Sequence, residues 1–227
     1  MRSPVIELEE IRLTLAAGGG EVNILNGVNL TVFERETLAV VGPSGSGKTT
    51  TLMIMSGLER PTSGRVAVAG TVLNALSEDD LARFRREHMG IVFQSFHLVP
   101  TMTALENVAL PLEFARNPAA RDAADAALAA VGLSGRAAHY PAQLSGGEQQ
   151  RVALARAFAG HPRVILADEP TGNLDQDTGG RVMDTLFGLS RTFGTTLVLI
   201  THDPKLAARC ERSVRMVSGG VLAMEAS

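Results

Sequence analysis

The stretch that decides the fold runs from Leu38 to Thr49 and reads LAVVGPSGSGKT. Its first four residues form a short, continuous apolar run, which is typical of a strand buried on both faces. The next eight, from Gly42 onward, match the pattern G-x-x-x-x-G-K-[ST] and stand where a strand passes into a helix expected from about Lys48. This order predicts the opening of an α/β core with a loop that cradles a phosphate group.

The residue types of this loop suit a nucleotide. Glycines let the backbone wrap closely, so that N–H groups and the helix N-terminus face phosphate oxygens. Lys48 can reach the β and γ phosphates, and the Thr49 hydroxyl can ligate Mg²⁺. Among twenty-one basic residues the only lysines are Lys48 and Lys205, which indicates a requirement for a compact ammonium at position 48. The predicted nucleotide contacts are Gly42, Pro43, Ser44, Gly45, Ser46, Gly47, Lys48, Thr49 and Thr50.

The composition is that of a globular domain. With 227 residues, 45% of them apolar, the chain can bury a full core, and its length fits one domain with an insertion or two small subdomains. The single cysteine, Cys210, has neither a disulfide partner nor a nearby histidine pair for zinc, so we expect a reducing compartment. Acidic and basic residues are interspersed at a net charge of −3, which excludes the electrostatic footprint of a nucleic-acid binder.

Membrane insertion is not expected from the sequence. No run approaches the roughly 20 apolar residues that a membrane helix needs, and the strongest candidate is the short stretch Thr195–Ile200. The N-terminus lacks a signal-peptide pattern, so we expect that the chain neither spans a membrane nor is exported by itself. We also expect no added regulatory domain after the tail that ends at Ser227.

The expected elements place a helical segment inside an α/β core. Apolar residues alternate from Ile6 to Leu15, and an apolar pattern continues from Val22 to Val32 beyond a Gly18-Gly19-Gly20 turn, which predicts antiparallel strands. Further strands are expected at Arg65–Val68, Thr71–Leu73, Ile91–Phe93, Val164–Ala167 and Leu197–Ile200, with a helix over Asp79–Glu87 and a final strand pair around Ser218-Gly219-Gly220.

Residues 101 to 160 are almost purely helical in character, beginning with a capping box at Thr103 and Glu106. We therefore expect a single domain, 1–227, in which a helical subdomain of about residues 98–159 interrupts a β subdomain and core formed by 1–97 and 160–227.

Two carboxylates end a second buried strand. Asp168 and Glu169 follow Val164–Ala167, and at the carboxyl edge of a parallel sheet they face a ligand crevice. Such residues by themselves are often a solvated loop or a helix N-cap. Beside a phosphate loop, Asp168 is predicted to hold Mg²⁺ and Glu169 to activate the attacking water as general base.

A second helix start has the features of an anion site. Ser145 and Glu148 stand at capping-box spacing, and Gly146 and Gly147 permit close approach to the helix N-terminus. Because the loop at 42–49 already cradles a phosphate, a second site makes sense if it closes over ATP bound by another copy of the chain. Read only as local structure, this is an ordinary helix start, and spacing alone does not decide between the two.

Six segments in order resemble the motifs of the ABC family of ATPases. Gly42–Thr49 resembles the Walker A motif, Leu144–Gln150 the signature and Val164–Glu169 the Walker B motif. Gln94 is similar to the Q-loop glutamine, Gly172–Asp175 to the D-loop and His202 to the switch histidine. Alone, Gln94 would more often be a solvated amide and His202 a surface or capping histidine, but the ordered set covers essentially the entire chain.

The resemblance implies a fold and a reaction. The fold is α/β, a P-loop NTPase core of the ABC type with an N-terminal antiparallel β subdomain and an inserted α-helical subdomain. The reaction is ATP hydrolysis with Mg²⁺, carried out by a head-to-tail homodimer that holds two ATP molecules and drives a separate membrane permease from the cytoplasmic face of the inner membrane. It implies catalytic roles for Lys48, Gln94, Glu169 and His202, metal ligation by Thr49, Gln94 and Asp168, and nucleotide contacts across the dimer from Ser145, Gly146, Gly147 and Asp175.

A finer resemblance points to a subfamily. Val92–Phe96, Leu105–Val108 and Ala167–Asp175 are similar to ATPases of lipoprotein release and macrolide efflux and to their uncharacterised-transporter relatives. This implies export or extraction of a lipoprotein, lipid or toxic compound, with cargo, direction and permease left open. The alternatives are a cell-division-type regulatory ATPase and a soluble ribosome- or DNA-acting ATPase. The latter is disfavoured by a single cassette in which Gln94 and Ser145 are separated by only 51 positions.

Two positions depart from the family pattern. Leu15 stands where many relatives place an aromatic ring under adenine, which predicts weaker or less base-selective nucleotide binding. Arg35 stands where a glycine is usual. A third hypothesis is that part of an apolar set after Gln94 receives a short permease helix, although ordinary packing explains each member nearly as well. The set is Phe96, Leu98, Val99 and Met102.

Overall fold

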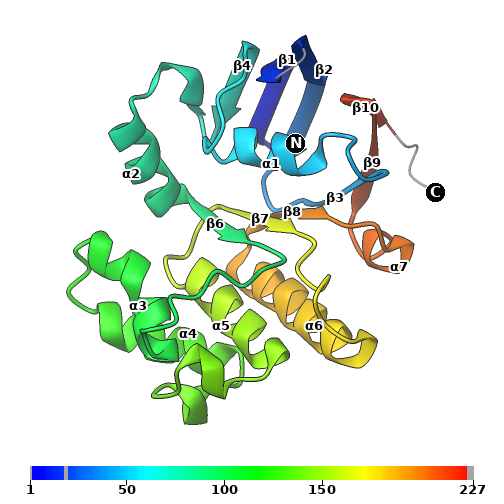
Figure 1. Ribbon diagram of the computed structural model, residues 1–227. Helices are drawn as coiled ribbons and strands as arrows, with labels where there is room; N and C mark the ends of the chain where they lie inside the picture. Colours follow the sequence, from blue (N-terminus) through cyan, green and yellow to red (C-terminus); the bar gives the residue numbers. More distant parts are fainter. Residues whose placement is uncertain (1, 18–19, 224–227) are drawn as a thin grey trace. The chain divides into compact units, whose positions relative to one another are not determined.

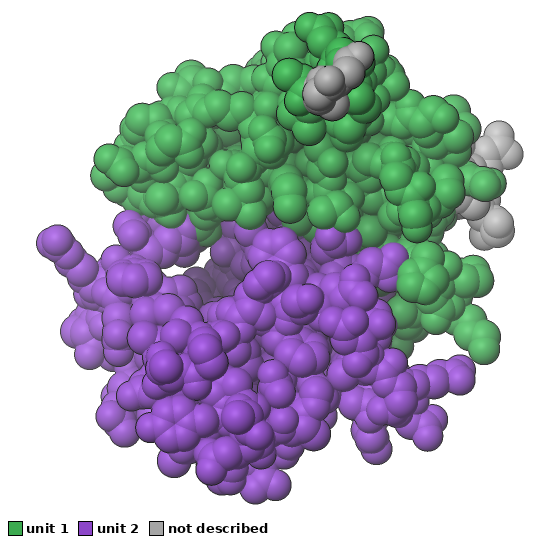
Figure 2. Space-filling view, viewed as in Figure 1, with its two compact units in different colours: residues 1–85, 196–227 green, residues 86–195 purple. Residues whose placement is uncertain are grey.

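The computed structural model of the protein describes residues 2–17 and 20–223 (Figure 1). Gly18 and Gly19 of the expected turn and the chain end at Ser227 lie outside the described residues. The chain forms two compact units: unit 1 contains residues 1–85 and 196–227, and unit 2 contains residues 86–195 (Figure 2).

The first sheet of unit 1 is the predicted antiparallel one. Its strand order is β2-β1-β4-β5, and β1 pairs with β2 over almost its whole length. The inward residues of β1 are Ile6, Leu8, Ile11 and Leu13, none more than 4% exposed. Ile11 follows Leu8 by three residues yet still points inward, because register shifts and a left-handed Glu10 (φ 49°) form a bulge between them. The strands are β1 Pro4–Ala17, β2 Gly20–Phe33, β4 Ser63–Val68 and β5 Thr71–Val72.

The second group of strands in unit 1 runs in the order β10-β9-β3-β8. Strand β3 is parallel to both of its neighbours, β8 and β9, while β10 is antiparallel to β9. The four apolar residues Leu197–Ile200 are at most 1% exposed, as expected of a strand covered on both faces. The elements are β3 Thr37–Val41, α1 Lys48–Met55, a 3-10 turn Leu73–Ala75, β8 Thr196–Ile200, α7 Pro204–Ala207, β9 Arg212–Val217 and β10 Gly220–Ala223.

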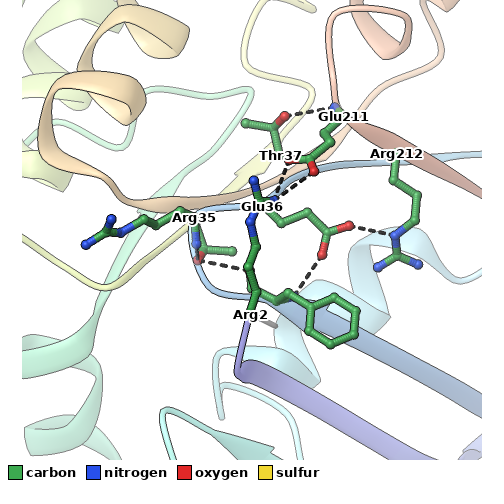
Figure 3. A network of polar contacts seen from close by, with 8 residues as sticks. Arg2, Arg35, Glu36, Thr37, Glu211 and Arg212 are labelled. Carbon is green, nitrogen blue, oxygen red and sulfur yellow. Dashed lines mark hydrogen bonds and ion pairs between the residues drawn. The ribbon is translucent and has the colours of Figure 1, made fainter.

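A polar network joins the start of β3 to β9 (Figure 3). Glu36 is only 3% exposed, and its carboxylate accepts from the Arg212 Nε at 2.6 Å and from the Phe33 backbone N–H at 2.8 Å. An outer ion pair, Arg2 with Glu211 at 2.7 Å, is about half exposed on both sides. The buried carboxylate is thus fully partnered inside unit 1.

Unit 2 contains two parallel strands, β6 and β7, and four helices, with α5 packed against α3, α4 and α6 (Figure 1). Helix α5 is buried on nearly all sides, with Val152, Ala153, Leu154 and Ala155 at most 1% exposed. The predicted capping boxes at Thr103–Glu106 and Ser145–Glu148 are both confirmed. The elements are α2 Glu78–His88, which begins in unit 1, β6 Met89–Val92, α3 Ala104–Phe114, α4 Ala120–Ala130, 3-10 turns Ser134–Arg136 and Pro141–Gln143, α5 Gly146–Phe158, β7 Val164–Asp168 and α6 Gln176–Phe193.

Two strand ends differ from the expectation. Leu73 belongs to a 3-10 turn and not to a strand, because the Asn74 side chain that follows accepts from Val66 N–H and donates to Gly64 O, in place of further pairing along β4. Strand β6 covers Met89–Val92, so Phe93 is outside it and Gln94 lies two residues beyond its end. Among the described residues, no helix is both long and apolar enough to cross a bilayer. The subdomain division at 97/98 and 159/160 stays a prediction.

Candidate nucleotide-binding site

The phosphate loop of unit 1 connects β3 to α1 as predicted, and its glycines are required by geometry. Gly42 and Gly47 have φ angles of 152° and 98°, values that L-residues rarely adopt. A Cβ on Gly47 would lie 2.7 Å from Leu25 Cδ2, and one on Gly42 would collide with the Met216 carbonyl oxygen. The loop can therefore keep its close approach to the strands only with glycine at both positions.

The cationic group of the loop is held over its own backbone. The Lys48 ammonium donates to the carbonyl oxygens of Gly42 at 2.9 Å and Pro43 at 2.8 Å. Helix α1 begins without a side-chain cap and without an acidic residue in its first turn. Its N-terminal N–H groups and the ammonium are therefore arranged for an anion, and a phosphate oxygen is a stronger partner for the ammonium than a neutral carbonyl.

A buried hydroxyl in the same loop supports this interpretation. Ser46 is 3% exposed, and its Oγ has no hydrogen-bond partner among the described residues. Buried hydroxyls are usually satisfied, and exceptions concentrate at places where a ligand or water completes the set. The chemistry of the loop thus fits a bound phosphate.

His202 leaves the same edge of the strands as the phosphate loop. Strands β3 and β8 are parallel with Val40 opposite Ile200, and the Thr201 N–H donates to Val40 O at 3.3 Å. Gly42 and His202 each lie two residues beyond this pair, so the register of unit 1 brings the loop and the exposed imidazole to one end of the sheet.

In unit 2, two parallel strands likewise bring predicted site residues to one edge. Strands β6 and β7 are parallel with Val92 opposite Ala167, so Gln94 and Glu169 each follow by two residues at the same edge. Glu169 has φ 46°, in the left-handed region that is uncommon for this residue type. Backbone strain of this kind costs about 1–3 kcal/mol and clusters at functional sites. Asp168 is the last residue of β7 and stands beside it.

The D-loop segment contacts Gln94 directly. Gln94 Nε2 donates to Asn173 Oδ1 at 3.2 Å, and Asn173 Nδ2 donates to the Gln94 carbonyl oxygen at 3.2 Å. A Cβ on Gly172 would lie 2.7 Å from Gln94 Nε2, so the glutamine side chain lies against the backbone of that turn. Asp175, predicted as a nucleotide contact, is the N-cap of α6 and accepts from Thr178 N–H at 3.0 Å, which lowers its pKa.

The signature segment forms the start of α5. Ser145 is the N-cap, and Glu148 Oε2 accepts from its backbone N–H at 2.9 Å and from its hydroxyl at 2.8 Å. The Ser145 N–H, then the Arg136 side chain and the Ser145 hydroxyl, lower the pKa of Glu148 to about 2. A Cβ on Gly147 would collide with Thr178 Cγ2, so glycine lets the start of α5 pack against α6.

Helix α5 also fixes the backbone around Gln94. The Gln150 Nε2 donates to Phe93 O at 3.3 Å, and the Arg156 guanidinium donates to Phe96 O at 2.9 Å and to His97 O at 2.7 Å. Gln150 is fully buried, and its Oε1 has no partner among the described residues. Gln150 and Arg156, like Asn173, were not predicted as site residues, because nothing in the sequence indicates contacts between positions 57 to 79 residues apart.

The oxygen donors predicted for Mg²⁺ fit that ion. Thr49, Gln94 and Asp168 offer a hydroxyl, an amide oxygen and a carboxylate, and Mg²⁺ in nucleotide sites uses few protein ligands together with phosphate oxygens and water. Within residues 2–17 and 20–223, no group of three or more His, Cys, Asp and Glu side chains could hold a metal ion.

Comparison with known proteins identifies the family of the chain. The family model described as "ABC transporter" matches residues 25–172. The chain is 51% identical over 217 residues to the uncharacterised ABC transporter ATP-binding protein YbbA of Escherichia coli, covering 95% of both chains. It is 51% identical over 221 residues to the lipoprotein-releasing system ATP-binding protein LolD of Geobacter metallireducens, covering 95% of this chain and 98% of that one.

The fold of the chain is also similar to that of a solved structure. The structure is that of the dimeric ATP-binding cassette MJ0796 in a post-hydrolysis state with bound ADP and phosphate. It is 40% identical in sequence to this chain and superposes with a TM-score of 0.89, over 98% of this chain and 100% of that one. The chain belongs to the ABC transporter family. It is an ATP-binding cassette that binds ATP with Mg²⁺ and hydrolyses it.

Proposed function

We propose that this ATPase drives a separate membrane permease that exports or extracts a lipoprotein, a lipid or a toxic compound. The observation that carries the proposal is the 51% identity, over nearly the full length of both chains, to an ATP-binding protein of a lipoprotein-releasing system. The ATPase acts at the cytoplasmic face of the inner membrane, bound there through its permease.

The proposed roles follow from the chemistry of each group. Lys48 neutralises charge on the β and γ phosphates, and Glu169 accepts a proton from the attacking water. His202 and Gln94 orient groups around the γ-phosphate. Thr49, Gln94 and Asp168 would hold Mg²⁺, which would neutralise charge on the phosphate oxygens. The strained backbone at Glu169 supports its role, because backbone strain of this kind clusters at functional sites.

The second proposed element is a head-to-tail homodimer around two ATP molecules. The start of α5 in one copy, Ser145–Gly147, contacts the γ-phosphate that is bound by Gly42–Thr49 of the other, and Asp175 lies at the same interface. Loss of the γ-phosphate removes these contacts and separates the copies. The dimeric state of the solved cassette relative supports this element.

Dimerisation is tested with a Glu169→Gln variant, which should bind ATP without hydrolysing it. With ATP and Mg²⁺, light scattering coupled to gel filtration should show a doubled mass. Adding Ser145→Asp keeps a good N-cap for α5 but places a negative charge where the phosphate arrives, so this variant should bind ATP and stay monomeric. A monomeric Glu169→Gln protein at saturating ATP would overturn the dimer.

The transport role is tested by affinity capture of tagged Glu169→Gln from detergent-solubilised membranes with ATP and Mg²⁺, followed by mass spectrometry. Stoichiometric recovery of a multi-span permease supports the proposal, and an external domain on that permease narrows the cargo. Recovery of a cell-division membrane complex would indicate a regulatory function in place of transport. Ribosomes or DNA as the only partners would contradict transport and leave the ATPase chemistry intact.

Half-buried apolar residues after Gln94 are the proposed contact with the permease. Phe96, Leu98 and Met102 are each partly exposed, and the Asn107 side chain holds the backbone of this segment by bonding Val99 N–H and O. Charged substitutions at Phe96 and Leu98 should abolish permease-stimulated ATPase activity and leave the activity of the isolated protein unchanged. Intact transport in these variants would refute the contact.

A further inference from the structure

The backbone of Gln94 does not determine which end of its side-chain amide faces the metal site. A glutamine amide has one acceptor end and one donor end, and only its oxygen can ligate Mg²⁺. The Gln150 and Arg156 side chains hold the backbone on both sides of Gln94 through Phe93 O, Phe96 O and His97 O. The Gln94 side chain is exposed and, without a further contact, could present either end of the amide.

Asn173 removes this ambiguity through a chain of donor and acceptor requirements. The backbone carbonyl oxygen of Gln94 can only accept a hydrogen bond. The Asn173 side-chain amide must therefore direct its Nδ2 towards this oxygen, at 3.2 Å. The Asn173 Oδ1 then faces the Gln94 amide, which must donate its Nε2, also at 3.2 Å. Assignment of amide ends from such networks leaves Gln94 Oε1 as the outward end, with no partner among the described residues.

The turn that carries Asn173 is itself anchored at both ends. The Gly172 N–H donates to Glu169 O at 3.0 Å, and Asp175 caps α6 two residues after Asn173. Gly172 leaves room for the Gln94 side chain, since a Cβ there would lie 2.8 Å from the Gln94 Cδ. The position of the Gln94 amide is therefore tied to the same turn that holds Glu169.

We propose that Asn173 is a positioning residue that fixes the Gln94 amide with Oε1 outward, ready to ligate Mg²⁺. This inference rests on the proposed function, in which Gln94 is a ligand of the metal. Asn173 acts through Gln94 and does not itself contact the metal or the nucleotide.

The test measures the affinity for AMP-PNP by calorimetry, once with Mn²⁺ as the probe ion and once with EDTA. The dissociation constant in EDTA divided by the dissociation constant in Mn²⁺ reports the metal contacts separately from the phosphate contacts. Asn173→Ala should lower this ratio about 10-fold, the scale expected when a residue that orients a ligand is removed, while the constant in EDTA stays unchanged. Asn117→Ala is the matched control, because within the described part of the chain its side chain accepts only from Ala119 N–H at the start of α4.

Variants at Gln94 separate orientation from a merely structural role. Gln94→Glu has two equivalent oxygens and needs no orientation, so Asn173→Ala should change the ratio less than about 2-fold in that background and also in Gln94→Ala. If Asn173→Ala does not fold, Asn173→Asp serves instead, since it keeps the acceptor and loses the donor.

An unchanged ratio in Asn173→Ala would overturn the inference directly, and two further results would overturn it in distinguishable ways. An undiminished effect of Asn173→Ala in the Gln94→Ala background means that Asn173 acts elsewhere, and the proposed function then stands. An unchanged ratio in Gln94→Ala alone means that Gln94 is not a metal ligand, and both the inference and that part of the proposed function then fail.

Discussion

At the scale of single residues, Arg35 shows why a glycine is usual at its position. Its backbone has φ 60°, and its N–H donates to Thr196 Oγ1 at 2.8 Å, a bond that glycine would keep. A left-handed L-residue costs about 1–2 kcal/mol, partly offset by the greater freedom of glycine in the unfolded chain. Arg35→Gly should therefore stabilise the protein by about 0.5–1 kcal/mol in urea unfolding. Arg35→Ala is the control and should give no gain, because it keeps the Cβ.

Glu36 and Glu211 test how burial changes the contribution of an ion pair within one network (Figure 3). Glu36 is buried and bonded to Arg212, whereas Glu211 pairs with Arg2 at the surface. Glu36→Gln should cost about 2–3 kcal/mol in urea unfolding, because it leaves a partly buried guanidinium without its counter-charge. Glu211→Gln should cost less than about 1 kcal/mol. Equal costs for the two variants would contradict this account.

Leu15 carries the prediction about base selectivity. It lies in β1 and is 45% exposed, so a side chain at this position is available to a ligand. Without an aromatic ring there, ATP and GTP should bind with comparable affinity, measured by calorimetry with the Glu169→Gln variant. Leu15→Tyr should strengthen binding of both nucleotides by about 10-fold, from the roughly 1–3 kcal/mol of base stacking. A strong preference of the Glu169→Gln protein for ATP over GTP would contradict the prediction.

At the scale of helices and strands, the start of α5 predicts a pH dependence of stability. The pKa of Glu148 falls from an ordinary value of 4.5 to about 2 in the folded protein. Its stabilising effect is therefore fully present above about pH 5 and is lost as the pH falls through the folded pKa. The difference in unfolding free energy between wild type and Glu148→Gln should shrink from pH 7 to pH 3. A difference that does not change with pH would refute the carboxylate's role.

Glu106 is the matched control for this measurement. It has the same place in the capping box of α3 with Thr103, whose hydrogen bonds lower the pKa of Glu106. Among the described residues, no arginine side chain donates a hydrogen bond to Glu106. Glu106→Gln should therefore show the same direction of pH dependence with a smaller amplitude. Both boxes were predicted from spacing alone, since their hydrogen bonds join residues only three apart.

At the scale of the whole molecule, Cys210 reports on opening of the fold. Burial raises the pKa of its thiol to about 12, and the thiolate is the reactive form. Native protein should react with iodoacetamide at pH 8 about a thousandfold more slowly than guanidinium-unfolded protein. ATP with Mg²⁺ should slow the reaction further in the Glu169→Gln variant, because ligand binding lowers the open population. Rapid native labelling would contradict this.

The sequence by itself determined the features that depend on near neighbours. Short stretches of sequence predict the buried parallel strands, the glycine-rich loop, the capping boxes and the motifs with their order. The reason is that backbone geometry and local hydrogen bonds act over a few residues. These features were sufficient to predict the α/β cassette, while the roles of the site residues stay predictions.

Only the tertiary structure decided the pairings between distant residues. Asn173 meets Gln94 across 79 residues, Arg156 meets His97 across 59, and Glu36 meets Arg212 across 176. The strain at Glu169 and the left-handed turn at Arg35 are likewise absent from any local pattern. The physical reason is that hydrogen bonding needs atoms placed to within a few tenths of an ångström, and only the packing of whole elements sets those distances.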